Sequence, residues 1–588
     1  MYHDPYLIQE SIELQSHAAT MHRFNSQLTD KIQKNEEAAT YYGTPLLKRA
    51  IEPMVNLIAA HCEAAATGGA MNRAVAFKFI RKFDPKVVAL LTARKIIDRI
   101  SGTNRLQDVA IQIGQALEDE LRYTSFNEQH PWLFKKLLTE TDTTRKRQRQ
   151  TIIAAYNRYC SVWEAWAKQD KLHVGMKLIE IFIDATGFVE INSRTPVKNR
   201  TELNLVATSK VVEFMEKNKD AAALMVPIRL PMVVPPNDWS APLSGGYITH
   251  HSPPLTFVKT SNRHYLEELD GLTGEMKDVY DAINTIQRTP WQVNPFVLVT
   301  FQMIDERGLA VAGLPAKEDI PKPPSPLNSD QDTKSLSDND KAKFKSWKKK
   351  ATLIYEENIR LKSKRLMTAK VGAIAEQFSG YSRIYFPHTL DFRGRAYPVP
   401  MYLNPQGNGL AKGLLQFADG KPLGTNEAAC ELAIHGANCF GYDKASMQER
   451  VDWVVENQDR ILQVAASPLD DLWWAKEADE PWCFLAFCKE WQGYCENGYD
   501  HINYIPIAKD GSCSGLQHFS AALRDPLGGA AVNLIPSDRP ADIYQSVIDK
   551  TKIKVIADLN GEDAAIAQAW LDYGMTRKTA KRCTMTRV

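Results

Sequence analysis

Apolar residues recur at helical spacing over roughly the first 225 residues of the chain. One such stripe, on a single helix face, consists of Val174, Leu178, Ile179 and Phe182. Gly187 follows where glycine commonly ends a helix, because it adopts the left-handed conformation without strain. We therefore predict a mostly helical N-terminal region.

Proline and β-branched residues replace this pattern at 227–239, and Leu243-Ser-Gly-Gly246 follows. Prolines and glycines at this density favour extended backbone and tight turns. The stretch therefore predicts an extended segment and a hairpin with a glycine-rich tip. Helical spacing returns at 281–286.

Residues 313–341 are rich in proline, serine and aspartate. This composition buries too little apolar surface to fold by itself, so we predict a linker and a domain boundary. Lys345-Ser-Trp-Lys-Lys-Lys350 then opens a long charged helix that we expect to reach about Phe378. Its lysines fit either a solvated spacer or contacts with a phosphate backbone.

Helical spacing continues through 427–500, where Trp473, Trp474 and Phe484 predict an aromatic core. The apolar run from Tyr504 to Ala508 then predicts a buried strand. Asp510 follows directly, at the end of a strand where open α/β sheets commonly place chemistry. Glycines favour a sharp turn there, and the residues after it predict a helix whose apolar face is Leu516, Phe519 and Leu523.

Residues 531–536 predict another strand, and Ser537 is a candidate N-cap for the helix that carries Asp542 and Tyr544. The last segment of the sequence is strongly basic, and Thr576 is a candidate cap for it. Two of its cations, Arg577 and Lys581, share a helix face. Cations stacked above free helix amides suit a triphosphate, but a basic surface helix explains this segment equally well by itself.

Composition and charge narrow the function classes. A chain of 588 residues exceeds what one hydrophobic core usually serves, so several domains are expected. The net charge of +2 excludes a uniformly basic surface but not nucleic-acid binding, because acidic and basic faces cancel in the sum. The nine cysteines form no Cys-x-x-Cys motif, so neither a disulfide framework nor structural zinc is expected. No signal peptide or membrane span is predicted.

Two basic motifs are ambiguous by themselves. Asp391-Phe-Arg-Gly-Arg395 places two arginines around a glycine, with Tyr397 and Lys412 nearby. Guanidinium groups bind phosphate bidentately, although a structural Asp–Arg turn is the commoner explanation of such a motif. Arg145-Lys-Arg-Gln-Arg149 fits a solvated helix face better than a phosphate contact.

Two kinds of enzyme fit the residues around Asp510. Nucleotidyl transfer needs carboxylates for two magnesium ions and cations for the leaving pyrophosphate. Asp510, Arg577 and Lys581 match these needs, Tyr544 suits a base or sugar, and a second acid is required. Alternatively, Cys513 occupies the nucleophile position of an elbow motif. No downstream histidine is marked for it, so a small packed cysteine is the better interpretation.

These motifs together resemble the single-subunit, bacteriophage-type RNA polymerases, of the T-odd phage kind with mitochondrial relatives. The resemblance covers essentially the whole chain, and the shared order and spacing make it very specific. It rests on Ala76-Phe-Lys-Phe79, His173-Val-Gly175, Pro231–Pro236, Asp391–Arg395, Pro405–Asn408, Lys412-Gly-Leu-Leu, Trp473-Trp-Ala, Phe484–Cys488, Asp510–Gly515 with Gln517-His-Phe, Asp542-Ile-Tyr544 and Arg577–Thr586.

The resemblance implies a role for each matching residue. Asp510 resembles the first metal-binding aspartate of a site for two Mg²⁺ ions, with the Gly511 carbonyl beside it. Lys581 resembles the catalytic lysine near the triphosphate, Arg577 its phosphate-binding partner, and Tyr544 a residue near the incoming nucleotide. The residues that resemble contacts to the template–transcript hybrid are Arg393, Arg395, Tyr397 and Lys412.

The implied fold is a mostly helical α+β right hand, and the glycine-rich segment near 232–247 resembles the hairpin that opens promoter DNA. The implied function is RNA synthesis from NTPs in the cytoplasm of a bacterial host, by a phage- or prophage-encoded monomer without a membrane. Double-stranded promoter DNA, the template strand and nascent RNA are the implied partners. The expected parts are a promoter, upstream-DNA and nascent-RNA domain (1–311), a linker and thumb helix (312–381), the first part of the palm (382–526) and the start of the fingers (527–588).

Two departures limit the resemblance. The family continues after Met585-Thr586 with a Leu-Pro/Ala-Tyr-Gly run, where this sequence has Arg587-Val588. The second metal-binding aspartate and most of the fingers belong to that later part. We therefore expect this chain alone to be inactive, as a remnant or as half of a split polymerase that keeps DNA binding and needs a complementing C-terminal chain. The loop before Ala76 has one basic residue, Arg73, where relatives often carry a basic loop for A/T-rich DNA.

Overall fold

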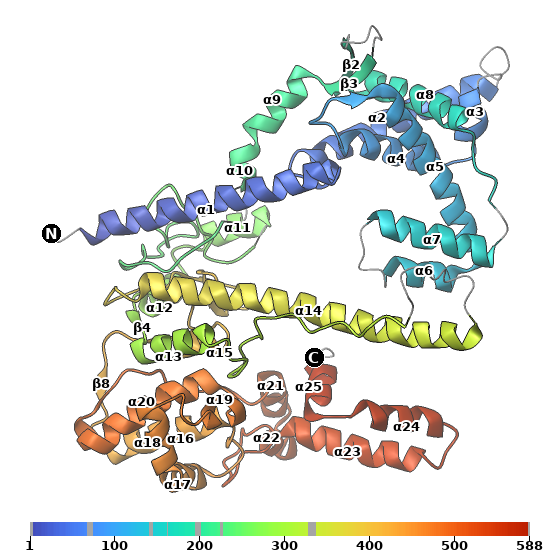
Figure 1. Cartoon of the computed structure of the whole chain (residues 1–588). Helices are drawn as coiled ribbons and strands as arrows, with labels where there is room; N and C mark the ends of the chain where they lie inside the picture. The colour runs from blue at the N-terminus through green and yellow to red at the C-terminus, as the bar shows by residue number, and fades with distance from the viewer. Residues whose placement is uncertain are drawn as a thin grey trace. The chain divides into compact units, whose positions relative to one another are not determined.

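The computed structural model describes residues 4–66, 75–139, 145–160, 163–194, 202–223, 227–260, 262–326 and 337–585. They form two compact units, which we call the N-terminal unit (Gln15–Ile228) and the C-terminal unit (Met1–Leu14 with Arg229–Val588). Helices dominate both units and the sheets are small (Figure 1), so the predicted mostly helical α+β class is confirmed.

The N-terminal unit is a helical bundle with one small sheet. Its helices after α1 (Pro5–Gln33) are η1 (Glu37–Ala39), α2 (Gly43–Ala66), α3 (Val75–Ile80), α4 (Pro85–Ile97), α5 (Leu106–Gln129), α6 (Pro131–Thr139), α7 (Arg145–Tyr159), α8 (Lys168–Thr186), α9 (Ser209–Lys217) and α10 (Lys219–Ala223). The antiparallel sheet has the order β1 (Asn104–Arg105), β3 (Glu202–Ala207), β2 (Val189–Arg194).

Helices α5 and α8 form the centre of this bundle. A Cβ at Gly114 would lie 2.5 Å from the Lys171 carbonyl oxygen, and one at Gly175 would lie 1.9 Å from that of Ala110. Only glycine therefore lets the two backbones approach so closely. The predicted stripe of Val174, Leu178, Ile179 and Phe182 is fully buried against this contact, and Gly187 ends α8 at a φ of 60°.

The C-terminal unit contains most of the short strands. Its helices are α11 (Arg263–Gly271), α12 (Lys277–Gln287), α13 (Pro295–Glu306), α14 (Asp338–Phe378), α15 (Gly409–Gly413), α16 (Asn426–Phe440), α17 (Met447–Glu456), α18 (Gln458–Ala466), α19 (Trp473–Glu477), α20 (Pro481–Asn497), η3 (Gly498–Asp500), α21 (Ser514–Leu523), α22 (Pro526–Ala531), α23 (Ile543–Asp558), α24 (Ala564–Tyr573) and α25 (Arg577–Met585). Its antiparallel pairs are β4 (Trp291–Val293) with β7 (Leu415–Phe417), β5 (His388–Leu390) with β6 (Ala396–Pro398), and β8 (Lys421–Pro422) with β9 (Ile502–Asn503).

The core of the C-terminal unit is built around α20. Phe484, Phe487 and Cys488 are completely buried, as is Trp474 of α19, so the aromatic core predicted from the sequence is confirmed. A Cβ at Gly436 would lie 2.3 Å from the Phe487 ring, so α16 packs against α20 through a glycine. No described helix is long and apolar enough to cross a membrane.

Helix α14 is the long charged helix predicted after the linker, drawn as one continuous element in Figure 1. It ends at Phe378 as expected but begins at Asp338, because the Ser337 side chain caps it by accepting a hydrogen bond from the Asp340 amide. The linker residues 327–336 and Arg73 lie outside the described residues. The side chains at 145–147 are also not described, whereas Arg149 forms an ion pair with Asp119 rather than a solvated face.

Two predicted strands are wrong, and the predicted hairpin forms only one antiparallel bridge. The backbone from Tyr504 to Asp510 is irregular, since the only described backbone–backbone hydrogen bond to it runs from the Phe417 amide to the Tyr504 carbonyl. Residues 531–536 form a turn, because Asn533 adopts a φ of 58° that no strand tolerates. The predicted hairpin near 232–247 is a loop closed by one bridge, Asn237 to Gly246, and its prolines lack the amides that a ladder needs.

Candidate active site

A cavity of about 1020 Å³ opens in the C-terminal unit beside the glycine turn that follows Asp510. Its walls come from the loop between α16 and α17, the turn itself, the loop that leads into α23, and the start of α25. The residues predicted from sequence that line it are Arg395, Asp510, Gly511, Tyr544, Arg577 and Lys581.

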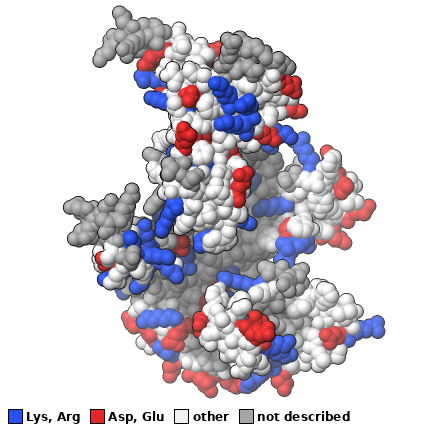
Figure 2. Space-filling model, turned by 90° about the vertical axis from the view of Figure 1, so that its right-hand side faces the viewer, with Lys and Arg blue, Asp and Glu red and all other residues white. Residues whose placement is uncertain are grey.

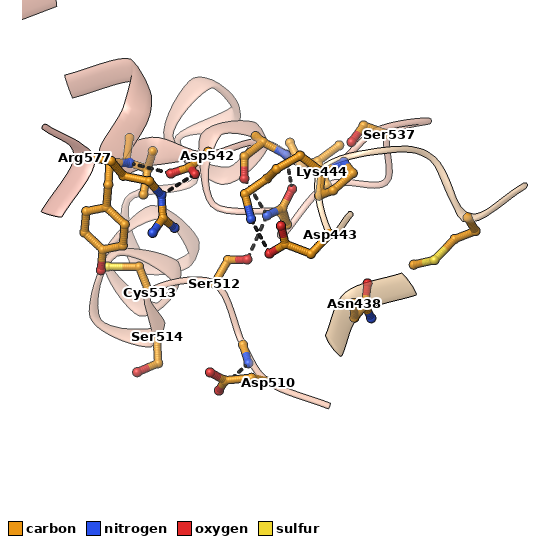
Figure 3. Close-up of a pocket in the computed structure, with 18 of the residues that line it drawn as sticks. Asn438, Asp443, Lys444, Asp510, Ser512, Cys513, Ser514, Ser537, Asp542 and Arg577 are labelled. Carbon is orange, nitrogen blue, oxygen red and sulfur yellow. Dashed lines mark hydrogen bonds and ion pairs between the residues drawn. The ribbon is translucent and has the colours of Figure 1, made fainter. Parts of the chain in front are cut away.

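Asp510 is an exposed carboxylate on an irregular segment. Its Oδ1 accepts a hydrogen bond from the Gly511 amide at 2.8 Å, and no cation of the described chain pairs with it. In Figure 3, Asp510 lies apart from the Arg577–Asp542 pair. Its carboxylate is therefore available to a ligand.

The turn after Asp510 is held by Asn533. The Asn533 Nδ2 donates to Ser512 Oγ at 2.8 Å and to the Ala541 carbonyl at 3.0 Å, and its Oδ1 accepts from the Ala541 amide. Asparagine tolerates the left-handed φ that this position requires. One side chain thus ties the turn to the residues before α23.

Asp542 caps α23 in place of the predicted Ser537. Its Oδ1 accepts hydrogen bonds from the amides of Tyr544 and Gln545, both at 3.1 Å, and its Oδ2 accepts from Arg577 Nε at 2.5 Å. Ser537 instead donates to the Arg539 carbonyl. Burial acts to raise the pKa of Asp542, but the bonds from Arg577 and Gln545 outweigh it and hold that pKa below its usual value.

The ring of Tyr544 contacts two of the cations of α25, Arg577 and Lys581. The guanidinium of Arg577 and the ammonium of Lys581 lie 5.6 and 5.7 Å from the centre of its ring. The side-chain hydrogen bond with Cys513 and the burial of the ring raise the pKa of Tyr544 to about 12. The phenol therefore stays protonated, and the ring braces both cations at the cavity wall.

Sequence reasoning missed a further cation, Lys444, which the loop after α16 brings to the cavity. Its Nζ lies 2.5 Å from Asp443. The buried Arg450 fixes this loop by donating to the carbonyls of Asp443 and Ala445 and to Asn438. The sequence offers little signal, because Lys444 becomes relevant only when the fold brings its loop to the cavity.

Three predicted nucleic-acid contacts do not line the cavity. Arg393 forms an ion pair with Asp391 at 3.2 Å, and Tyr397 and Lys412 are exposed on β6 and α15. Asp391 Oδ1 also accepts from the amides of residues 393 and 395, so the motif is a tight structural turn. Arg395 leaves that turn exposed and reaches the cavity.

The cysteine-nucleophile alternative lacks a base. Cys513 has a φ of 56°, a strained conformation that elbow nucleophiles also adopt. Its described side-chain hydrogen bond goes to Tyr544, however, and no histidine of the described ranges bonds to it. The geometry therefore favours Cys513 as a packing partner of Tyr544.

The cavity holds charges of both signs. On the face of the molecule in Figure 2, patches of basic and acidic residues are interspersed. Asp443 and Asp542 each pair with a cation, whereas Asp510 and Asp538 have no cation partner among the described residues. The described chain gathers no group of three or more His, Cys, Asp or Glu residues that could hold a metal ion. Asp510 can therefore provide one carboxylate ligand to a metal ion, but the described residues do not complete a metal site.

Comparison with known proteins identifies the family to which the chain belongs. Residues 421–588 match the family model described as DNA-dependent RNA polymerase, and residues 8–288 match the one described as DNA-directed RNA polymerase N-terminal. The chain is 36% identical over 550 residues to the DNA-directed RNA polymerase of Enterobacteria phage K11, covering 86% of this chain and 59% of that protein. It is 33% identical over 615 residues to T7 RNA polymerase of Escherichia phage T7, covering 98% and 68%.

A more distant relative is the mitochondrial DNA-directed RNA polymerase of Neurospora crassa, 33% identical over 72% of this chain and 30% of that protein. The chain thus spans between about three tenths and two thirds of the length of these relatives. Two family models and similarity to phage enzymes over nearly its whole length agree with the resemblance in the motifs. The chain belongs to the phage-type, single-subunit family of DNA-directed RNA polymerases.

Proposed function

We propose that the chain acts in DNA-directed RNA synthesis and that the cavity beside Asp510 binds the incoming NTP. One observation carries the proposal: a carboxylate without a cation partner among the described residues shares a single cavity with Lys444, Arg577 and Lys581. Nucleotidyl transfer needs cations on the leaving side and a carboxylate that can hold a metal ion beside the reacting phosphate.

In the proposed reaction, the 3′-hydroxyl of the RNA attacks the α-phosphorus of the NTP and pyrophosphate leaves. Lys581 and Arg577, at the start of α25, offset the negative charge that develops on the leaving phosphates, and Lys444 adds a cation from another wall. Tyr544 keeps the α25 cations in place through its ring.

Magnesium is part of this proposal. When bound, the ion polarises the reacting phosphate and lowers the pKa of the attacking hydroxyl. Asp510, with the Gly511 carbonyl beside it, is one ligand in the proposed site. The described residues gather no larger set of ligands, so we expect this chain to need further carboxylates before it extends RNA.

Double-stranded promoter DNA, the template strand and the nascent RNA are the proposed partners. The exposed lysines of α14 and the exposed side chains of Arg393, Arg395, Tyr397 and Lys412 suit their phosphates. We assign Arg393, Tyr397 and Lys412 to the nucleic-acid surface and the cavity to the nucleotide. Arg395, which lines the cavity, belongs to both.

A second candidate function is that of a DNA-binding chain that a complementing C-terminal polypeptide completes. The observation in its favour is the exposure of large apolar side chains on α21 to α24, such as Leu523 at 71% and Leu527 at 83%. Surfaces of this kind commonly mark a missing contact. Protection of these residues from hydrogen exchange on mixing with the last third of a phage polymerase would favour this candidate.

Competition between nucleotides tests the proposed function. With magnesium present, a fluorescent ATP analogue should be displaced equally well by ATP, GTP, CTP and UTP, because the cavity cations contact phosphates rather than bases. AMP should compete at least tenfold less well, since it lacks the two phosphates that those cations bind. Displacement that depends on the base and not on the phosphates would refute the proposal.

A further inference from the structure

A second polar cavity, of about 530 Å³, lies within the N-terminal unit. It is formed where α4 ends, where β1 leads into α5, and where α8 begins. Its lining is Arg99, Thr103, Asn104, Arg105, Asp108, Val109, Ile111, Gln112 and Lys168. No aromatic residue is among these, so the cavity offers no ring on which a base would stack.

The walls of this cavity are fixed by the backbone. Asn104 Nδ2 donates to the carbonyls of Arg99 and Gly102 at 2.8 and 3.1 Å, which closes the turn after α4. Asn104 and Arg105 then pair with β3. The cavity is therefore preorganised by a turn and a sheet rather than by a free loop.

Positive charge dominates the lining. Three cations, Arg99, Arg105 and Lys168, face a single carboxylate, that of Asp108. Arg105 is already paired, because its Nη2 donates to Glu202 Oε1 at 2.6 Å. Arg99 and Lys168 have neither an ion pair nor a side-chain hydrogen bond within the part of the chain that the structure describes.

Arg99 is the most informative of these residues. Arg99 is partly buried, and a partly desolvated guanidinium without a counter-ion is unfavourable. Helix α5, whose first turn lines the cavity, also directs its positive end there.

We infer that this cavity binds a phosphate of a nucleic-acid backbone, with Arg99 and Lys168 as its ligands. The inference rests on the proposed function, in which the chain acts on DNA. A site with cations, amides and hydroxyls but no stacking ring recognises the phosphate and sugar and not the base sequence. The contact is therefore independent of sequence and sensitive to salt.

The test is the salt dependence of duplex DNA binding by the full chain, measured by fluorescence anisotropy. The double variant Arg99→Ala/Lys168→Ala should bind about tenfold more weakly at low salt. Its slope of log affinity against log salt should be shallower by about 0.9 for each phosphate that the variant no longer neutralises. Arg99→Lys combined with native Lys168 should keep most of the parent slope, because it retains the charge.

A matched control is Lys48→Ala/Lys210→Ala, which removes two exposed cations of the same unit outside the cavity. Equal slopes for the cavity and control variants would overturn the inference. So would a cavity variant that loses inorganic phosphate binding but keeps the parent DNA slope, since that result would indicate a site for a small anion. A parent chain that binds no DNA would instead contradict the proposed function.

Discussion

Two neighbouring regions of the C-terminal unit bury their apolar residues very differently. Between residues 403 and 505, the side chains of Trp474, Phe484 and Phe487 are completely buried. Between residues 514 and 585, the largest described buried cluster is Ile548, Met575 and Ala580, while Leu527 is 83% and Tyr573 71% exposed. The region that carries Tyr544, Arg577 and Lys581 therefore lacks a sizeable core of its own among the described residues.

The two regions therefore have different roles, one in stability and the other in forming the cavity. The first region supplies the free energy that holds the unit together, while the second presents cations and a capped helix to the cavity. Regions with few buried apolar contacts open locally at low free energy, and ligand-binding elements are drawn from them. The nucleotide side of the cavity is thus expected to become ordered on binding.

Truncation of a buried ring should have the largest effect. Trp474→Ala should lower the free energy of unfolding by about 3–5 kcal/mol, because it leaves a cavity and removes the hydrogen bond from its Nε1 to the Pro468 carbonyl. Leu527→Ala, the control in the second region, should change it by less than about 0.5 kcal/mol. Urea denaturation measures both, and equal costs would contradict the comparison.

Asn533 allows its backbone and side-chain roles to be separated. Asn533→Gly keeps the left-handed φ but loses three hydrogen bonds, and Asn533→Asp keeps only the acceptor for the Ala541 amide. Because these bonds fix the turn after Asp510, both variants should weaken NTP binding about tenfold, and the glycine variant should also speed hydrogen exchange at Ala541. If the glycine variant bound NTP like the parent, the side chain would have no positioning role.

Asp542 should make the stability of the second region depend on pH. Its folded-state pKa is depressed below 3.8, so the stabilisation is present above that pH and is lost as the pH falls through the folded value. Asp542→Asn keeps the helix cap but loses the ion pair with Arg577. It should therefore lower the free energy of unfolding by about 1–3 kcal/mol at pH 6 and by progressively less below pH 4. A pH-independent difference between the two unfolding curves would show that the Arg577 pair contributes nothing.

The smallest expected effect concerns the phenol of Tyr544, whose pKa is raised to about 12. Cys513→Ala removes the hydrogen bond that raises it most, so the pKa should move back toward 10. NMR titration of tyrosines labelled at Cζ would detect this shift. NTP binding should change by less than a factor of two, whereas a cysteine nucleophile would make the same variant inactive.

The sequence predicted helices better than strands, for a physical reason. A helix depends on residues close together in the sequence, so the apolar spacing over 174–182 was enough to predict one. Gly187 ends that helix as expected. A strand needs a partner, and no described segment forms a ladder with 504–510, so its apolar run did not become β-structure. Asp510, Arg577 and Lys581 were identified from their residue chemistry and spacing and then from the family motifs. Lys444 and Asn533 enter the site only through contacts with residues distant in sequence.

Triphosphate binding in the cavity beside Asp510, through the cations of α25, is the central claim. Titration of the fluorescent ATP analogue into parent, Lys581→Ala and Lys554→Ala chains tests it most directly, since Lys554 is an exposed lysine of α23 outside the cavity. We predict at least tenfold weaker binding for Lys581→Ala and parent-like binding for Lys554→Ala. Equal affinities for all three chains would contradict the claim.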